Sequence, residues 1–169
     1  MKLTLTPLSA NRTVPISATQ QALLDAVRTE RDAMYFYLRA ARTARDGRAR
    51  RVFNNLAEDE RRHIEWFLET CSGNDLPDLQ TCLDRGRNEA NGWLEELENT
   101  YAADSTDLAA LELAMRKEEE LEQHLRRQAA KQTDLQIKRV YLANADATHQ
   151  HYETIRAELQ RLSGEQNRT

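Results

Sequence analysis

The stretch VFNNLAEDERRHIEWF (residues 52–67) decides how this sequence folds, because an apolar stripe and two inward polar groups occur in it together. Apolar side chains recur there at spacings of three and four, the pattern of one buried face of an α-helix, at Phe53, Leu56, Ile64 and Phe67. Glu60 and His63 fall on the same face. The stretch therefore predicts a helix that carries a carboxylate and an imidazole into a core.

Long stretches on both sides of this segment have the same helical character. The chain has only three prolines and five glycines, and between them strong helix formers such as Ala, Leu, Glu, Arg and Gln dominate. We predict four long helices, from Ser17 or Thr19 to Arg45, over 49–71, from Ser105 or Thr106 to Ala130, and from Thr133 or Asp134 to Leu162. A shorter helix is expected over 88–99, with Trp93 and Leu97 facing inward.

Each long helix has one apolar stripe and a polar remainder, so each needs a packing partner. In the last helix the stripe is predicted at Leu135, Leu142, Tyr152 and Leu159. The predicted fold class is all-α: a four-helix bundle of two antiparallel hairpins. The connection over 72–104 is long enough to cross from one end of the bundle to the other. Residues 1–16 are expected to be extended or loosely ordered, and 17–165 to form a single domain.

Composition excludes several classes of protein. The chain has 169 residues, enough for one domain with a core, and a net charge of −4, which gives no reason to expect nucleic acid as a partner. No apolar run is long enough to span a membrane, and the first residues do not read as a secretory signal. Two cysteines cannot form a four-cysteine iron site and are expected to be free thiols in a reducing, cytoplasmic environment.

Charged residues interrupt all four apolar stripes near mid-length. Helical spacing puts a carboxylate on the inward face of every long helix, and the second and fourth helices add a histidine three residues later. The predicted layer consists of Glu30, Glu60, His63, Glu118, Asp146 and His149. One such residue alone would be read as a boundary side chain that reaches solvent. The remaining histidines, His124 and His151, fall off the predicted inward faces and are expected at the surface.

An internal repeat supports this layer. LDAVRTERDAMYFY (24–37) aligns with LELAMRKEEELEQH (111–124) up to one position of drift, and LAEDERRH (56–63) aligns more clearly with LANADATH (142–149). The first pair of carboxylates is then offset by 88 residues and the other ligand positions by 86. A duplicated helical hairpin would explain a two-fold arrangement of the predicted ligands.

Four buried carboxylates cannot all remain bare anions, since desolvation would raise their pKa values or unfold the bundle. Two divalent cations would supply four positive charges against four negative ones, with both histidines neutral. Carboxylate oxygen together with imidazole nitrogen suits iron or manganese, and zinc less specifically. The sequence therefore predicts a buried two-metal centre.

At these residues the chain resembles the ferritin-like di-iron carboxylate proteins, and most of all their rubrerythrin branch, without a rubredoxin domain. The resemblance implies that Glu30 and Glu118 are terminal ligands. It implies that Glu60 and Asp146 bridge two iron ions and that His63 and His149 each bind one ion. Tyr37, seven residues after Glu30, matches the tyrosine that these proteins place beside the cluster. Manganese or a mixed iron and manganese pair is the alternative cofactor.

The implied activity is that of an oxidoreductase that reduces hydrogen peroxide or dioxygen, with electrons from a separate donor protein and a homodimer as the expected assembly. The chain departs from the branch in two ligand positions. Asp146 is one methylene shorter than the usual Glu, and Leu121 stands where rubrerythrins have a further Glu, with Glu122 next to it.

Three other functions remain open on the sequence alone. Ferroxidase activity with ferrous iron as substrate would make the chain an iron-handling protein. A substrate pocket beside the metals would make it a hydroxylase of an organic molecule. A polar layer without metals would leave a structural helical bundle.

Overall fold

The computed structural model describes residues 18–70, 79–86, 91–103 and 106–166, and the regular structure in these ranges is entirely helical. The helices are α1 (Ala18–Thr43), α2 (Gly47–Thr70), α3 (Leu79–Gly86), α4 (Gly92–Ala103), α5 (Asp107–Lys131) and α6 (Leu135–Gln166). The all-α prediction is confirmed, and the four long helices begin and end within a few residues of their predicted limits. None of the described helices is both long and apolar enough to cross a membrane.

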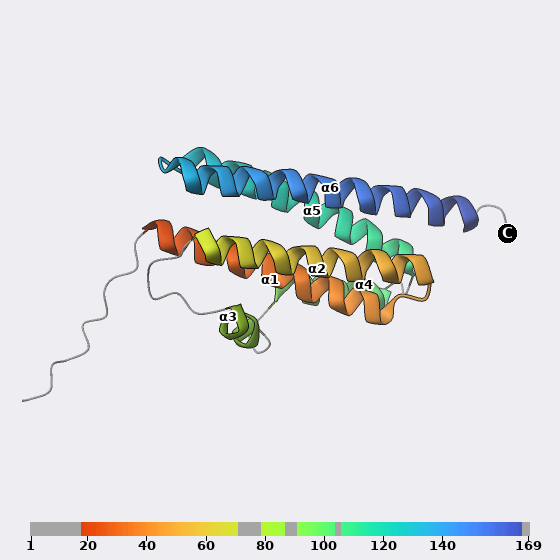
Figure 1. Cartoon of the computed structure of the whole chain (residues 1–169). Coiled ribbons are helices and arrows are strands. Elements are labelled where there is room, and N and C mark those ends of the chain that lie inside the picture. Colours follow the sequence, from red (N-terminus) through yellow and green to blue (C-terminus); the bar gives the residue numbers. More distant parts are fainter. Residues whose placement is uncertain (1–17, 71–78, 87–90, 104–105, 167–169) are drawn as a thin grey trace, which may run out of the picture.

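Two antiparallel hairpins form the bundle (Figure 1). Helix α1 packs along α2, α5 packs along α6, and the two hairpins meet chiefly through α2 and α6. The tight turns of the two hairpins lie at opposite ends of the bundle. The predicted ferritin-like architecture of two hairpins is therefore present.

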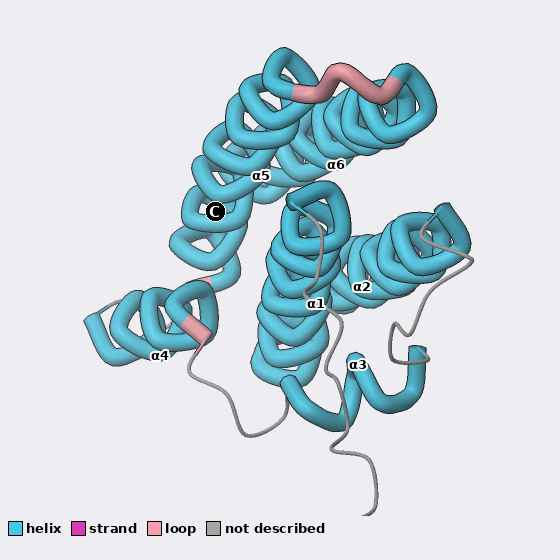
Figure 2. The backbone as a smooth tube through the Cα atoms, turned by 90° about the vertical axis from the view of Figure 1, so that its left-hand side faces the viewer, coloured by secondary structure: helices cyan, strands magenta, loops and turns pink. Residues whose placement is uncertain are grey.

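The connection between the hairpins runs back along the bundle, as predicted. Helix α3 lies against α1 and α2, and α4 lies at the side of the bundle and packs against α1 and α5 (Figure 2). The sequence prediction missed α3 and placed α4 a few residues too early. Asn91 fixes its start, because the Asn91 side chain accepts hydrogen bonds from the backbone N–H groups of Trp93 and Leu94. Residues 1–16 and parts of the 72–104 connection lie outside the described residues, so the predictions made for them stay predictions.

The predicted inward residues of α4 are in place. Leu97 is fully buried, and Trp93 packs edge-on against Phe36 of α1, with ring centroids 5.7 Å apart. Polar side chains cap the starts of two long helices; the cap at Thr106 is predicted from the sequence, and the cap at Asp46 is not. Asp46 accepts hydrogen bonds from two N–H groups of α2, and Thr106 accepts one from α5.

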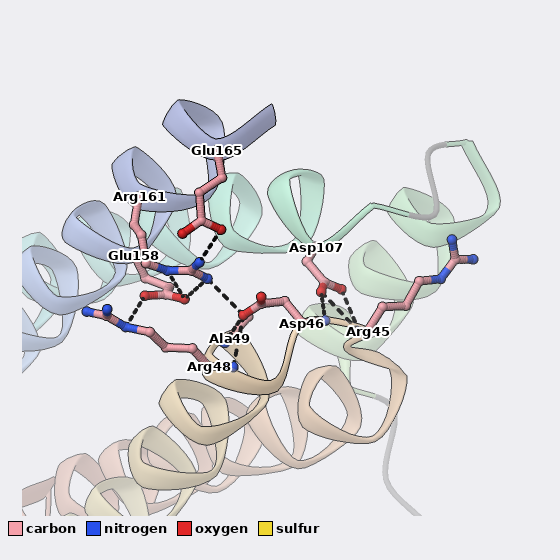
Figure 3. A network of polar contacts seen from close by, with 8 residues as sticks. All are labelled: Arg45, Asp46, Arg48, Ala49, Asp107, Glu158, Arg161 and Glu165. Atoms are coloured by element: carbon pink, nitrogen blue, oxygen red, sulfur yellow. Dashed lines mark hydrogen bonds and ion pairs between the residues drawn. The ribbon is translucent and has the colours of Figure 1, made fainter. Parts of the chain in front are cut away.

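A polar network, here called the corner clasp, ties the α1–α2 corner to the other hairpin (Figure 3). It consists of Asp46, Arg48, Asp107, Glu158 and Arg161. Asp107, at the start of α5, accepts hydrogen bonds from the backbone N–H groups of Arg45 and Asp46 at 3.0 and 2.6 Å. Arg161 of α6 reaches Asp46 at 2.8 Å and Glu158 at 2.5 Å. The clasp fixes how far α5 and α6 are shifted along α1 and α2.

The predicted inward face of α6 is wrong. Leu135 and Leu142 are 68% and 36% exposed, whereas the buried face contains Tyr141, Asn144, Thr148, His151 and Ile155. Two polar residues, Asn144 and Thr148, occupy core positions there, so the apolar pattern pointed to the wrong side of the helix. This rotation of α6 changes which of its residues reach the centre of the bundle.

Candidate metal centre

Four helices each bring polar side chains to one place in the core. Glu30 comes from α1, Glu60 and His63 from α2, Glu118 from α5 and His151 from α6. The three carboxylates are fully buried, and the two histidines are 8% and 6% exposed. These residues are called the five-residue cluster below. Buried ionisable groups cost stability unless they are paired or bind a metal, so this cluster is the strongest candidate for a functional site among the described residues.

The first half of the cluster joins α1 to α2. His63 Nδ1 lies 3.0 Å from Glu60 Oε2 and 3.4 Å from Glu30 Oε2. Glu60 and His63 are three residues apart, so one helical turn places both on the inward face. Their ligand atoms and that of Glu30 lie within 4.8 Å of one another, which is close enough to surround one ion.

The second half joins α2 to α5 and α6. His151 Nδ1 lies 3.4 Å from Glu60 Oε1 and 3.6 Å from Glu118 Oε1. Glu60 therefore turns one carboxylate oxygen toward each histidine and belongs to both halves. The two imidazole rings stack, with centroids 5.4 Å apart. The arrangement is a pair of three-residue groups that share Glu60.

The three carboxylates repel one another in this dry environment. Burial, and then the negative charge of Glu60, raise the pKa of Glu30 to about 8. Burial likewise raises the pKa of Glu118. Burial alone would also raise the pKa of Glu60, but the imidazoles of His151 and His63 outweigh it and lower the pKa. Without a metal, the cluster therefore keeps protons on some of its groups.

The neighbouring carboxylates raise the pKa values of the two histidines against the effect of burial. Burial alone would lower the pKa of His63, but Glu30 and Glu60 raise it to about 10. Glu118 and Glu60 raise the pKa of His151 to about 11 in the same way. The protonated imidazoles neutralise the same carboxylates that bound metal ions would neutralise. Metal ions and protons therefore compete for the cluster.

Tyr37 lies beside the cluster, as predicted. Its hydroxyl is fully buried and donates a hydrogen bond to Glu118 Oε1. Burial and the neighbouring negative charge of Glu118 raise the pKa of Tyr37 well above its usual value, so the phenol remains a donor. A carboxylate held in this way keeps its other oxygen for a second partner.

The donor set fits divalent metal ions. Four buried ligand atoms have no hydrogen-bond partner within the part of the chain that the structure describes: Glu30 Oε1, Glu60 Oε1, Glu118 Oε2 and His151 Nδ1. Carboxylate oxygens with one imidazole nitrogen on each side suit iron or manganese. Glu30 and His63 could hold one ion, Glu118 and His151 a second, and Glu60 could bridge them.

Two predicted ligands lie elsewhere. The Asp146 side chain is 67% exposed and pairs with Arg126 at 3.0 Å, and the His149 side chain is 54% exposed and pairs with Glu122 at 3.0 Å. The prediction that Asp146 and His149 face the core is wrong, because the buried face of α6 is rotated from the predicted one. The Glu122 carboxylate pairs with Arg126 and His149 and is not part of the five-residue cluster.

The sequence prediction placed His151 at the surface, and this is wrong as well. The signal that identifies His151 is a uniform offset between the two hairpins. The 88 residues that separate Glu30 from Glu118 also separate His63 from His151 and Glu60 from Thr148. The alignment with an 86-residue offset pairs Asp146 with Glu60 and His149 with His63, because both pairs have the acid–x–x–His spacing. Asp146 and His149, however, lie on the exposed face of α6.

A groove between α2 and α6 leads to the cluster. It has a volume of about 500 Å³, and His63 and His151 are among its lining residues. Asp59, Arg62 and Gln150 also line it, so polar side chains from both helices reach its wall. The groove gives a small polar molecule a path to the imidazole side of the cluster.

Comparison with protein-family models identifies the family of this chain. No curated protein and no solved structure shows significant similarity to the chain. The family model for rubrerythrin matches residues 21–159, a span that contains all five buried groups and Tyr37. The chain therefore belongs to the rubrerythrin family.

Proposed function

We propose that this protein is a di-iron oxidoreductase that reduces hydrogen peroxide, with electrons returned by a separate donor protein. One observation carries the proposal: Glu60 faces His63 with one oxygen and His151 with the other, between two further buried carboxylates. Family membership supports the same reaction class. Glu30, Glu60, His63, Glu118 and His151 replace the ligand set expected from the sequence.

Two ferrous ions bound there would supply the two electrons that convert one peroxide and two protons into two waters. The residues of this chain have separate tasks in that reaction. The Tyr37 hydroxyl holds one oxygen of Glu118, which leaves the other free for an ion. The apolar core around the cluster excludes bulk water, and the groove between α2 and α6 admits a small oxidant.

A pair of histidines two residues apart provides the test. We expect the purified chain to bind two ferrous ions under anaerobic conditions and one peroxide to oxidise both. His151→Ala should lose at least one ion and most of the peroxide reaction, because it removes the only imidazole of the second three-residue group. His149→Ala, the matched control, should keep both, because that side chain is exposed. Circular dichroism checks that each variant is folded.

The same experiment separates the competing functions. If wild-type protein binds no iron, or if His149→Ala and His151→Ala behave alike, the di-iron proposal is wrong. If dioxygen oxidises the bound iron faster than peroxide does and the iron then leaves the cluster, the chain is an iron-handling ferroxidase instead.

A further inference from the structure

The two halves of the cluster differ at one position. The 88-residue offset that relates Glu30 to Glu118 and His63 to His151 places Thr148 where the first half has Glu60. Glu60 is the group that faces both histidines. Its counterpart is a hydroxyl, which has no negative charge at neutral pH. The α6 side of the centre therefore has no bridging carboxylate.

Thr148 also differs from other threonines of these helices in the hydrogen bonding of its hydroxyl. Its side chain is fully buried, and its Oγ1 has no hydrogen-bond partner among the described residues. A helical threonine can satisfy its hydroxyl by donating to the carbonyl four residues earlier. Five threonines make that bond: Thr29, Thr43, Thr70, Thr100 and Thr154. Thr148 does not, so its hydroxyl remains available to a ligand.

Asn144 lies one turn before Thr148 on the same face of α6. It is fully buried, and neither its Nδ2 nor its Oδ1 has a partner in the described part of the structure. Its counterpart in the first half is Leu56, an ordinary apolar core residue. A buried amide without partners costs stability, so its presence at a core position calls for a ligand. Asn144 and Thr148 together offer two neutral donors on the side that lacks the carboxylate.

The charge of the centre selects the ligand. Three carboxylates bring three negative charges, whereas two divalent ions bring four positive ones, which leaves one positive charge in a buried site. On the basis of the proposed metal centre, we infer that Asn144 and Thr148 bind a small exogenous monoanion, of the size and shape of formate, in the place of the missing carboxylate. The anion completes the charge balance that the protein leaves open.

Cobalt(II) is a suitable probe because its visible absorption reports the ligands around it and it does not react with formate. The protein is loaded with two cobalt ions per chain and titrated with formate. We expect saturable binding of one formate per chain, seen as a change in the cobalt bands. Thr148→Glu should keep two ions and lose the formate response, since its own carboxylate fills the position.

Two further variants complete the test. Asn144→Leu, which copies Leu56, should keep two ions and bind formate about five- to tenfold more weakly, as expected for one lost hydrogen bond. Thr43→Glu, the matched control at an exposed helical threonine outside the groove, should leave formate binding unchanged. Asn144→Leu keeps the inference testable if Thr148→Glu fails to fold.

The outcomes separate this inference from the proposed function. A wild-type chain that binds fewer than two ions overturns the proposed function and this inference with it. Two bound ions with no formate response overturn the inference alone. So does a formate response that survives Thr148→Glu, or one that Thr43→Glu removes as fully as Thr148→Glu does.

Discussion

Glu60 is the residue that links the two halves of the cluster. It is fully buried, and both of its oxygens face imidazoles from different helices. The sequence identifies it, together with Glu30, His63 and Glu118, because helical spacing alone places these residues on inward faces. Tyr37 is found through the family resemblance. The sequence does not identify His151, because the exposed pair Asp146 and His149, two residues earlier, has the acid–x–x–His spacing expected of the ligands.

Replacing single carboxylates should separate shared from unshared ligands. We expect Glu60→Gln to lower the metal content from about two ions per chain to less than one, because both three-residue groups lose a member. Glu30→Gln should retain about one ion, since Glu60, Glu118 and His151 remain together. Metal analysis after equilibrium dialysis measures both.

Glu58→Gln is the control for these variants, because Glu58 is an exposed residue of the same helix. Equal losses in Glu60→Gln and Glu30→Gln would contradict a bridging role for Glu60.

At the scale of elements, α6 shows where pattern analysis fails. The four long helices and both hairpins follow from breakers, caps and apolar spacing. The orientation of α6 does not follow, because its core face has Asn144 and Thr148 while its outer face has Leu135 and Leu142. Apolar spacing identifies a core face only where the core is apolar, and a polar site reverses that signal. Helix α3 is missed because eight residues contain too little periodicity.

The groove between α2 and α6 predicts an effect of added bulk. Ala147 lines this groove, and Ala143, one turn earlier on α6, lines a separate hollow beside Trp66. We expect Ala147→Phe to slow oxidation of the iron-loaded protein by peroxide about tenfold, which corresponds to a barrier higher by about 1.4 kcal/mol. Stopped-flow absorption measures the rate.

Ala143→Phe is the matched control and should leave the rate unchanged. Both variants should keep the wild-type iron content. An equal rate in Ala147→Phe and wild type would show that peroxide reaches the cluster by another path.

At the scale of the whole molecule, the corner clasp sets the register on which the cluster depends. Asp46 caps α2 and also accepts a hydrogen bond from Arg161 near the end of α6. Asp107 attaches the start of α5 to the same corner. Ligands from four helices meet only if the two hairpins keep their relative shift. Sequence spacing places the ligands near mid-length but does not reveal these contacts between distant segments.

The clasp predicts a stability that depends on pH. Hydrogen bonds from the N–H groups of Ala49 and Arg48, together with Arg161, lower the pKa of Asp46 below its usual 3.8. The charged form therefore stabilises the fold above that value, and the contribution is lost as the pH falls through the lowered pKa. We expect Asp46→Ala to reduce the free energy of unfolding by about 1 kcal/mol at pH 7. Urea denaturation measures this loss.

The same comparison at pH 3 should give a smaller difference between Asp46→Ala and the wild type. Glu58→Ala, in the exposed part of α2, serves as the control. A difference that stays constant between pH 7 and pH 3 would mean that the Asp46 charge contributes nothing.

The crossover between the hairpins has a consequence for how the centre can vary. If one hairpin paired with a second copy of itself, two-fold symmetry would force every substitution to occur on both sides of the axis at once. Joining the halves in one chain removes that constraint. One half can then retain a glutamate while the other exchanges it for a threonine. The covalent connection between the two hairpins thus allows an asymmetric site to arise within a two-fold symmetric arrangement of helices.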